Sequence, residues 1–379
     1  MVAVPLTQGP AGVLVLEDGR EFPGRFVGAR AGVGELVFTT NMTGYQEVLT
    51  DPSFAGQIVV MTAPMIGNYG VNPVDEQSGE PQVAGFVVRE LRESAGSWRA
   101  DGSLVDYLVS HGIPVLAGVD TRAVTRHVRA LGAMRAVVAP ADLDRSAVRE
   151  LLLGEPDMRG RDLASEVSTP DAYVVEPEGE PRGEVVCLDL GVKRRSLELI
   201  AAEGYRVRVV PSRTTAEEIL ASPPAGLFVS NGPGDPEAVP TAAATLRAVA
   251  DAGVPVFGIC LGCQLVARAY GGGTYKLPYG HRGGNHPVRN LDTGQVEITS
   301  QNHGFAVSEN DAGQVEGAPD LEVTHRNLND GTIEGLRHRN RRVFAVQYHP
   351  EAAPGPHDSR YLFERFVEAM NATRAVTTG

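Results

Sequence analysis

Short apolar runs separated by turn residues predict strands in the first part of the chain. From residue 12, GVLVLEDG alternates into a turn at Asp18-Gly19, a pattern typical of a half-buried strand. Helices are predicted from Gly102 to Ser110 and from Thr121, where Asp120 suits an N-cap and Gly132 a stop. These elements predict a mixed α/β domain. Its other strand-like runs are RFVGA, GELVFTTN (34–41), GQIVVMTAP (56–64) and VAGFVVREL (83–91).

From residue 184 the pattern becomes a regular alternation of apolar strands and amphipathic helices. EVVCLDLG (184–191) predicts a strand, and the helix after it ends at Gly204. After residue 271 the runs become short and strand-like, and the helix YLFERFVEAM closes the chain. Such alternation predicts a doubly wound, mostly parallel sheet. The runs between are YRVRVVP, TTAEEILAS, GLFVS, PTAAATLRAVADAG and VPVFGI (254–259).

Residues 151–183 separate these two patterns. They contain four prolines, with glutamates and glycines between them, a composition that predicts a linker. The predicted organisation is therefore a mixed α/β domain over 1–150, a linker over 151–183 and a doubly wound α/β domain over 184–379.

Charge and composition narrow the class of protein. The chain has 34 basic and 47 acidic residues, a net charge of −13, which argues against non-specific nucleic-acid binding because that requires a basic face. No run approaches the roughly 20 apolar residues that span a bilayer, and the first residues lack the pattern of a secretory signal. Three cysteines, Cys187, Cys260 and Cys263, are too few for a disulfide framework. We therefore expect a cytoplasmic protein with no membrane contact.

Cys260 is the first candidate for chemistry. It follows an apolar strand, and Gly258 and Gly262 flank it at the G-x-C-x-G spacing of a nucleophile elbow. The N-terminus of the following helix favours thiolate over thiol. The alternative is that a cysteine after a buried strand is a small core residue, and we expect that role for Cys187 and for Cys263.

His349 and Glu351 can complete a nucleophilic site. The run VFAVQYHPE predicts a strand that delivers His349 at its end, and in an extended chain Glu351 projects to the same side as His349. A thiolate nucleophile needs such a proton-transferring base and a carboxylate that orients it. Alone, a His and a Glu near a strand end are usually just solvated. Together with the elbow cysteine they predict a triad.

A glycine-rich loop, SNGPGDP (230–236), follows another predicted strand. Gly232 and Gly234 allow backbone N–H groups to approach a substrate closely, as an oxyanion hole requires. A phosphate-binding loop is the alternative, but the loop lacks the Lys-Ser/Thr of a P-loop and the G-x-G-x-x-G spacing of a dinucleotide site.

Histidines 281, 286 and 303 invite a metal interpretation, because imidazole binds zinc. No cysteine or carboxylate occurs nearby at ligand spacing, so we expect histidines that stabilise loops and no metal site.

GICLGCQ, SNGPGDP and HPE, in this order, resemble the class I, triad-type glutamine amidotransferases over residues 184–379. The resemblance implies hydrolysis of L-glutamine through a Cys260 thioester, with His349 as acid/base and Glu351 as orienting carboxylate. It also implies that the Leu261 N–H and the Gly234 region are oxyanion donors. Where that family usually has His, this chain has Cys263. Because that His is outside the triad, we expect catalysis to survive.

The segments 33–72 and 118–133 resemble the family of carbamoyl-phosphate synthetase small subunits, as do 280–288, 301–307 and 349–358. The resemblance implies a partner, the large subunit, which makes carbamoyl phosphate from bicarbonate, ATP and the released ammonia for arginine and pyrimidine biosynthesis. It implies that 1–150 docks the partner, that this chain has no cofactor, and that ATP, Mg²⁺ and also K⁺ bind the large subunit. The implied glutamine-binding residues are Ser53, Gly232, Gly234, Leu261, Gln264, Asn302, Gly304 and Phe305.

Two other functions fit the same motifs less well. One is the glutaminase of another synthase, of the anthranilate or GMP type, against which the long N-terminal extension argues. The other is a non-catalytic regulatory subunit, against which the intact Cys260, His349 and Glu351 argue.

Overall fold

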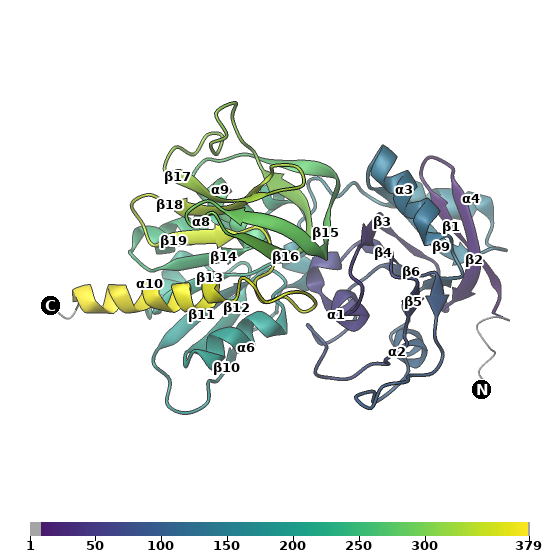
Figure 1. Cartoon of the computed structure of the whole chain (residues 1–379), viewed down its shortest axis with the longest axis horizontal. Coiled ribbons are helices and arrows are strands. Elements are labelled where there is room, and N and C mark those ends of the chain that lie inside the picture. The colour runs from purple at the N-terminus through teal and green to yellow at the C-terminus, as the bar shows by residue number, and fades with distance from the viewer. Residues whose placement is uncertain (1–8, 378–379) are drawn as a thin grey trace. The chain divides into compact units, whose positions relative to one another are not determined.

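The computed structural model describes residues 9–377, the side chains of 374–377 excepted (Figure 1). Its contacts divide the chain into two compact units. The N-terminal unit comprises Met1–Met158 and Pro278–Arg282, and the C-terminal unit comprises Arg159–Leu277 and Gly283–Gly379.

A closed barrel forms the centre of the N-terminal unit, with the strand order β1-β2-β8-β6-β4-β3-β9. Successive residues of a strand point to opposite faces, so each barrel strand contributes to two cores. In β4, Ile58 and Val60 pack in one core, and Val59 and Met61 pack in the other. The strands of this unit are β1 (Ala11–Leu16), β2 (Glu21–Val27), β3 (Gly32–Thr39), β4 (Gln57–Met61), β5 (Met65–Ile66), β6 (Gly85–Val87), β7 (Glu90–Leu91), β8 (Val115–Ala117) and β9 (Met134–Pro140).

Side-chain caps begin the helices of this unit except α1, which begins after Gly44 without one. The Asp120 side chain accepts a hydrogen bond from the Ala123 N–H (3.0 Å), and Gly132 ends the same helix with φ 99°. Such caps satisfy amides that have no partner within the helix. The predicted start and stop of this helix are therefore confirmed. The helices are α1 (Tyr45–Thr50), η2 (Pro52–Phe54), α2 (Leu104–Ser110), α3 (Thr121–Leu131) and α4 (Arg145–Gly154).

A 10-stranded sheet forms the centre of the C-terminal unit, in the order β10-β12-β11-β13-β14-β19-β18-β17-β15-β16. From β12 to β19 neighbouring strands are parallel, and antiparallel strands extend the sheet on both sides. The strands are β10 (Tyr173–Val175), β11 (Glu184–Asp189), β12 (Arg206–Pro211), β13 (Gly226–Val229), β14 (Val256–Ile259), β15 (Thr274–Asn290), β16 (Val296–Val307), β17 (Leu321–Asn327), β18 (Ile333–His338) and β19 (Val343–Val346).

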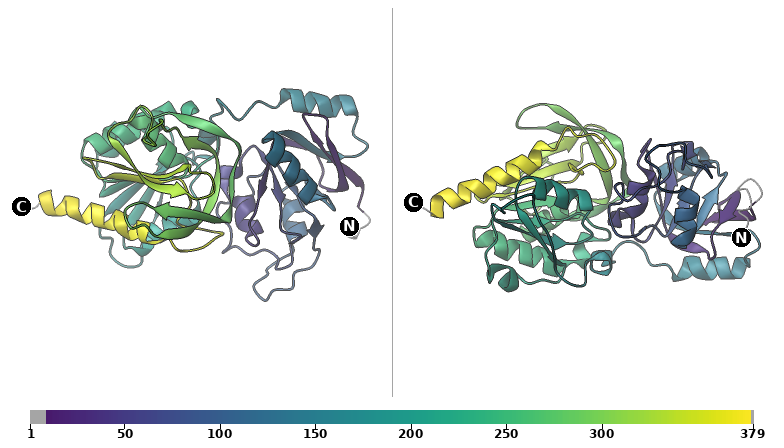
Figure 2. Two further views of the ribbon diagram at one scale, coloured as in Figure 1. Left: turned by 45° about the horizontal axis from the view of Figure 1, so that its top comes forward. Right: turned by 90° about the horizontal axis from the view of Figure 1, so that it is seen from below.

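Helices cover both faces of the parallel strands, as Figures 1 and 2 show. Leu246 of α8 and Val266 of α9 pack in the core on one face, whereas Ile200 of α6 and Phe366 of α10 pack on the other. The predicted doubly wound α/β fold is therefore confirmed. No helix of the described chain combines the length and apolar character needed to cross a bilayer. The helices are α5 (Leu163–Val167), α6 (Arg194–Ala202), α7 (Ala216–Leu220), η3 (Pro236–Ala238), α8 (Pro240–Asp251), α9 (Leu261–Ala269) and α10 (Tyr361–Thr377).

The structure corrects the predicted domain boundaries. Residues 151–183 were predicted to be a linker, but they contain the end of α4, the helix α5 and the edge strand β10, which pairs with β12. The first unit ends at Met158 rather than at residue 150, and it also includes Pro278–Arg282 from the middle of β15. The runs after residue 271 were expected to be short, but β15 and β16 have 17 and 12 residues.

Candidate active site

The carboxyl ends of the parallel strands bring the predicted triad together. Ile259, at the end of β14, pairs with Val346, at the end of β19, and the Cys260 N–H donates to the Val346 carbonyl (2.9 Å). In open α/β sheets this edge is where ligands bind. The connection after β19 carries His349 to the same edge, so residues far apart in sequence meet there.

Cys260 occupies a strained elbow that its two glycines make possible. Its φ of 55° and ψ of −104° are rare for a residue with a side chain. A Cβ on Gly258 would lie 2.7 Å from the Gly262 carbonyl oxygen, and a Cβ on Gly262 would lie 2.2 Å from the Val229 carbonyl oxygen. Only glycine therefore fits on either side of Cys260, as the G-x-C-x-G pattern predicted.

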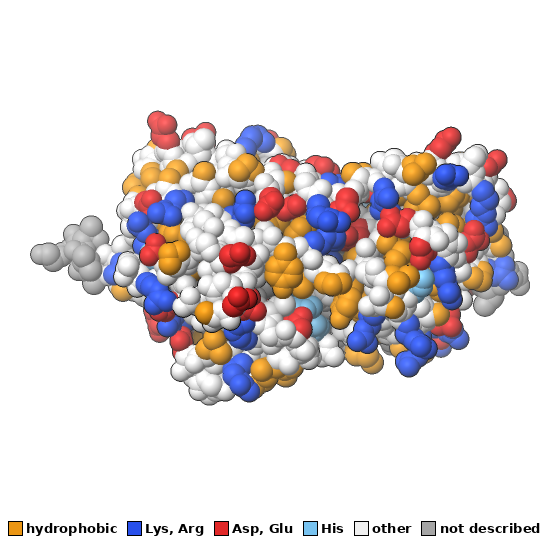
Figure 3. All heavy atoms as spheres, turned by 90° about the horizontal axis from the view of Figure 1, so that it is seen from above, with side chains coloured by type: hydrophobic (Ala, Val, Ile, Leu, Met, Phe, Trp, Pro, Cys, Tyr) orange, Lys and Arg blue, Asp and Glu red, His pale blue; other side chains and the backbone are white. Residues whose placement is uncertain are grey.

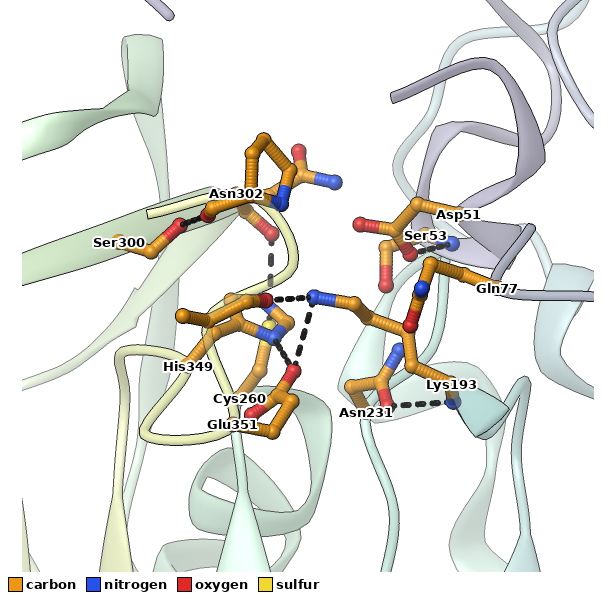
Figure 4. A network of polar contacts seen from close by, with 12 residues as sticks. Asp51, Ser53, Gln77, Lys193, Asn231, Cys260, Ser300, Asn302, His349 and Glu351 are labelled. Carbon is orange, nitrogen blue, oxygen red and sulfur yellow. Dashed lines mark hydrogen bonds and ion pairs between the residues drawn. The ribbon is translucent and has the colours of Figure 1, made fainter. Parts of the chain in front are cut away.

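His349 and Glu351 are paired and fully enclosed. Nδ1 of His349 lies 2.6 Å from Oε1 of Glu351, so Nδ1–H donates to the carboxylate and Nε2 is left for chemistry. The predicted contact is present, but its predicted cause is wrong. Residues 349–352 form a turn, in which the Ala352 N–H donates to the His349 carbonyl (3.0 Å), and are not extended chain. Figure 4 shows the pair beside Cys260.

The charges of this cluster depend on one another. Burial disfavours a charge on His349, but the Glu351 carboxylate and the Cys260 thiol outweigh burial and raise the pKa of His349 above its ordinary value. Burial would raise the pKa of Glu351, but Lys193 and His349 hold it below its ordinary value. The arrangement therefore favours an imidazolium held by a carboxylate, next to a sulfur.

Close packing against backbone requires glycine at positions 232 and 234 of the loop 230–236. A Cβ on Gly232 would lie 2.0 Å from the Leu190 carbonyl oxygen, and a Cβ on Gly234, which has φ 91°, would lie 2.6 Å from the Arg161 carbonyl oxygen. Leu261 is the first residue of α9, so its N–H has no carbonyl a turn earlier in the helix. That amide is available to an oxyanion, but the assignment of Leu261 and Gly234 as donors stays a prediction.

Two of the predicted glutamine-binding residues of the C-terminal unit, Gln264 and Asn302, contact Cys260 through backbone atoms. The Cys260 sulfur lies 3.4 Å from the Asn302 carbonyl oxygen. The side-chain amide of Gln264 donates to the Phe305 carbonyl (2.8 Å) and to Oε1 of Gln347 (3.1 Å). Asn302, Gly304 and Phe305 all belong to β16. Their contact with glutamine stays a prediction, and Gln264 acts here as a support for β16.

Ser53 belongs to the N-terminal unit. It lies in η2, and its backbone N–H donates to the Asp51 carboxylate (2.9 Å), which caps this short helix (Figure 4). The position of Ser53 in this short helix is explained by the Asp51 cap alone. Its contact with glutamine stays a prediction.

The other two thiols are enclosed in the core. Burial raises the pKa of Cys187 and of Cys263 well above the ordinary value, and the nearby carboxylates of Asp189 and Glu334 add to the effect. Both thiols are therefore protonated at neutral pH, which agrees with the expected structural roles.

His303 shows hydrogen bonding of a structural kind. Its ring nitrogens lie 2.7 Å from the Phe305 carbonyl and 3.0 Å from Oε1 of Gln301. One detail differs from the sequence expectation, which found no carboxylate near these histidines: ligand atoms of His281, His303 and Glu334 lie within 4.8 Å of one another.

Sequence reasoning missed Lys193. Its ammonium lies 3.0 Å from Oε1 of Glu351 and also donates to the Ala352 carbonyl, and its side chain is only 2% exposed. A signal was present, because Lys193 and Lys276 are the chain's only lysines and Lys193 follows the carboxyl end of a buried strand. The sequence alone did not indicate that Lys193 and Glu351 lie close together.

A cysteine elbow on a doubly wound sheet, with a paired His and Glu at the end of the next parallel strand, defines the class I glutamine amidotransferases. Residues 186–369 match the family described as glutamine amidotransferase class-I. Residues 14–138 match the carbamoyl-phosphate synthase small chain, CPSase domain. The chain belongs to the family of carbamoyl phosphate synthase small chains.

Relatives of that name match nearly the whole chain. The small chain from Syntrophotalea carbinolica is 49% identical over 375 residues, which is 96% of this chain and 98% of that protein. The one from Mycolicibacterium paratuberculosis is 50% identical over 368 residues, covering 95% and 98%. The one from Synechococcus is 49% identical over 380 residues, covering 97% and 95%. These relatives therefore match both units of the chain.

Proposed function

We propose that this chain hydrolyses L-glutamine to glutamate and ammonia through a thioester on Cys260, and that it passes the ammonia to a large synthetase chain. The observation that carries the proposal is the assembly of Cys260, His349 and Glu351 at one sheet edge, with Nδ1 of His349 held 2.6 Å from Glu351. A nucleophile, a base and an orienting carboxylate in this order are the requirements of acyl transfer.

In the first half-reaction the Cys260 sulfur attacks the side-chain amide carbon of glutamine. The developing negative charge on the amide oxygen is stabilised by backbone N–H groups, for which Leu261 and the Gly234 region are the candidates. The His349 imidazolium donates its Nε2 proton to the leaving nitrogen, and ammonia departs. The carbon–nitrogen bond has then been replaced by a carbon–sulfur bond.

In the second half-reaction water replaces the sulfur. Neutral His349 takes a proton through Nε2 from the attacking water, and Glu351 stabilises the imidazolium that forms. Glutamate leaves and the sulfur is restored. Because acylation needs the imidazolium and deacylation needs the neutral ring, the proton affinity of His349 must suit both steps.

Ammonia has to be consumed before water protonates it, because ammonium is not a nucleophile. The family name of small chain supports a large chain as the consumer. That partner makes carbamoyl phosphate from bicarbonate and ATP, and it binds the ATP, Mg²⁺ and K⁺ of the reaction. The product serves arginine biosynthesis, pyrimidine biosynthesis or both.

The experiment is to purify the chain with its large partner and to measure carbamoyl phosphate formation from glutamine and, separately, from ammonium. Cys260→Ser should abolish synthesis from glutamine and preserve synthesis from ammonium, since ammonia is consumed on the other chain. Cys263→Ser is the matched control and should remain active, because Cys263 lies in the core. Loss of glutamine-dependent synthesis in the control alone would refute the assignment of the nucleophile.

A further inference from the structure

The turn after Glu351 has an unfavourable backbone conformation. Ala352 and Ala353 have φ values of 59° and 53°, in the left-handed region that residues with a Cβ rarely adopt. Two such residues in succession persist only where surrounding contacts fix them. Because Glu351 immediately precedes them, whatever fixes this turn also fixes the carboxylate.

Contacts from two other elements fix the turn. The Lys193 ammonium donates to the Ala352 carbonyl, and the Ser300 hydroxyl donates to the Pro354 carbonyl (2.8 Å). The His349 N–H donates to the Ser300 carbonyl (2.9 Å), so β16 holds both ends of the segment. Figure 4 shows the contacts of the Lys193 ammonium and the Ser300 hydroxyl near Glu351. Of these two side chains that bond the turn, Lys193 is the charged one.

Lys193 is itself held in place before it reaches the turn. It lies at the junction of β11 and α6, where its backbone N–H donates to Oδ1 of Asn231 (3.2 Å). The Asn231 amide in turn donates to the Gly191 carbonyl (2.8 Å). A buried lysine needs such support and a countercharge, because an isolated ammonium in the protein interior is strongly unfavourable.

Lys193 and His349 use the same carboxylate oxygen. Oε1 of Glu351 lies 3.0 Å from the Lys193 ammonium and 2.6 Å from Nδ1 of His349, whereas Oε2 has no hydrogen-bond partner among the described residues. The negative charge of Glu351 is therefore shared between two cations. A carboxylate that also faces an ammonium stabilises the imidazolium less than an unshared carboxylate does.

We propose that Lys193 is a positioning residue of the glutaminase site, which anchors Glu351 and its turn and limits how strongly Glu351 stabilises the imidazolium of His349. The inference rests on the proposed function of the triad. It assigns to Lys193 an action through Glu351 and not a contact with glutamine.

The groups that face His349 define the pH dependence. They are Glu351 from the turn, Lys193 from the β11–α6 junction and Cys260 from the β14–α9 elbow. Glu351 and Cys260 raise the pKa of His349, and Lys193 lowers it. Removal of the ammonium therefore raises the pKa of His349, so the neutral ring that deacylation needs becomes scarce at neutral pH and returns only at higher pH.

The test is Lys193→Met in the full chain with its large partner, assayed for glutamate release from glutamine across pH. We expect kcat at pH 7 to fall about tenfold or more, and its rise with pH to move upward by about one unit. Lys193→Arg, which keeps the charge, should restore part of kcat. Arg194→Met is the matched control, because it removes an exposed charge at the next residue, and it should behave as the wild type.

Mass spectrometry supplies a second measurement. If deacylation is slowed, the glutamyl thioester should accumulate in Lys193→Met and not in the control. A rise in KM alone, with unchanged kcat and pH profile, would overturn the inference, because Lys193 would then bind glutamine. A wild-type complex without glutaminase activity would instead refute the proposed function.

A further variant covers the case in which Lys193→Met folds poorly. Ala352→Gly relieves the left-handed strain, since glycine adopts positive φ readily. The double variant should be more stable to heat than Lys193→Met and should keep the displaced pH profile. If Ala352→Gly stabilises the wild type and the Lys193 variant equally, Lys193 does not hold the turn.

Discussion

Cys260 is held in its unusual conformation by its neighbours, and not by its own preference. Its backbone has φ 55°, and its sulfur lies 3.4 Å from the Asn302 carbonyl. His349 contributes through its orientation, because the bond from Nδ1 to Glu351 leaves Nε2 for proton transfer. At the scale of the residue, the chemistry depends on fixed directions as much as on residue types.

His349 and Glu351 should differ in what their loss does. His349→Asn removes the proton-transferring group and should lower glutaminase kcat by about 10³-fold or more, whereas Glu351→Gln should lower it less, because it removes only orientation and charge. Glu351 raises the pKa of His349, so Glu351→Gln should move the pH dependence of kcat to lower pH.

The measurement is kcat against pH for both variants in the complex, with circular dichroism to verify folding. Equal and complete loss in both, with folding intact, would contradict this division of roles. A shift of the Glu351→Gln profile to higher pH would contradict the sign of the electrostatic argument.

In the β14–α9 elbow, close backbone contacts leave no room for a side chain at the two glycines that flank Cys260. Gly262 lies against the Val229 carbonyl, and the Gly262 N–H donates to the Ser230 carbonyl (3.1 Å), so the elbow and the loop after β13 are in direct contact. This contact places the first amides of α9 next to the loop that contains Gly232 and Gly234.

Gly262→Ala should therefore disturb both stability and activity. Its Cβ would lie 2.2 Å from backbone, so β13 or α9 must move, and we expect a loss of about 1–3 kcal/mol together with most glutaminase activity. Gly154→Ala, at the end of α4, is the control, since a Cβ there meets nothing within 4 Å and should change stability by less than about 1 kcal/mol. Thermal unfolding and glutaminase assays measure both effects. Equal behaviour of the two variants would show that the elbow tolerates a side chain.

At the scale of the whole molecule, the two units carry different kinds of residue. All three cysteines lie in the C-terminal unit, so the barrel unit contributes no thiol chemistry. On the face drawn in Figure 3, acidic and basic side chains are interspersed. Many arginines are paired locally, as Arg337 is with Glu322 (2.7 Å) and Arg326 with Glu309 (2.7 Å).

The free chain should hydrolyse glutamine slowly, and the large partner should raise its kcat/KM by about 5- to 150-fold, the usual range of coupling between sites. A slow free chain avoids wasteful hydrolysis of glutamine. The physical reason for the faster complex is that docking can tighten the geometry of Cys260 and His349. The assay compares glutamate release by the free chain and by the complex at the same pH. The complex of His349→Asn is the control and should stay inactive. A free chain as fast as the complex would contradict the coupling.

The sequence by itself determined the doubly wound sheet, the start and end of α3 and the choice of residues for the candidate triad. Hydrophobic period and caps are local, so Asp120 and Gly132 marked α3 correctly. The glycines around Cys260 marked the elbow, because a close approach of backbone leaves no room for a Cβ. Local patterns were misleading where long-range contacts decide, as in the predicted linker that contains β10 and in residues 349–352, which were predicted as extended chain and form a turn.

The tertiary structure alone decided which residues meet at the carboxyl edge of the sheet. The order of β11, β13, β14 and β19 depends on long-range pairing, which no local pattern encodes. That order brings Lys193 to Glu351, although 157 residues separate them along the chain. It also makes the turn at Ala352 and Ala353 possible, because contacts from Lys193 and from β16 hold a conformation that the chain would not adopt on its own.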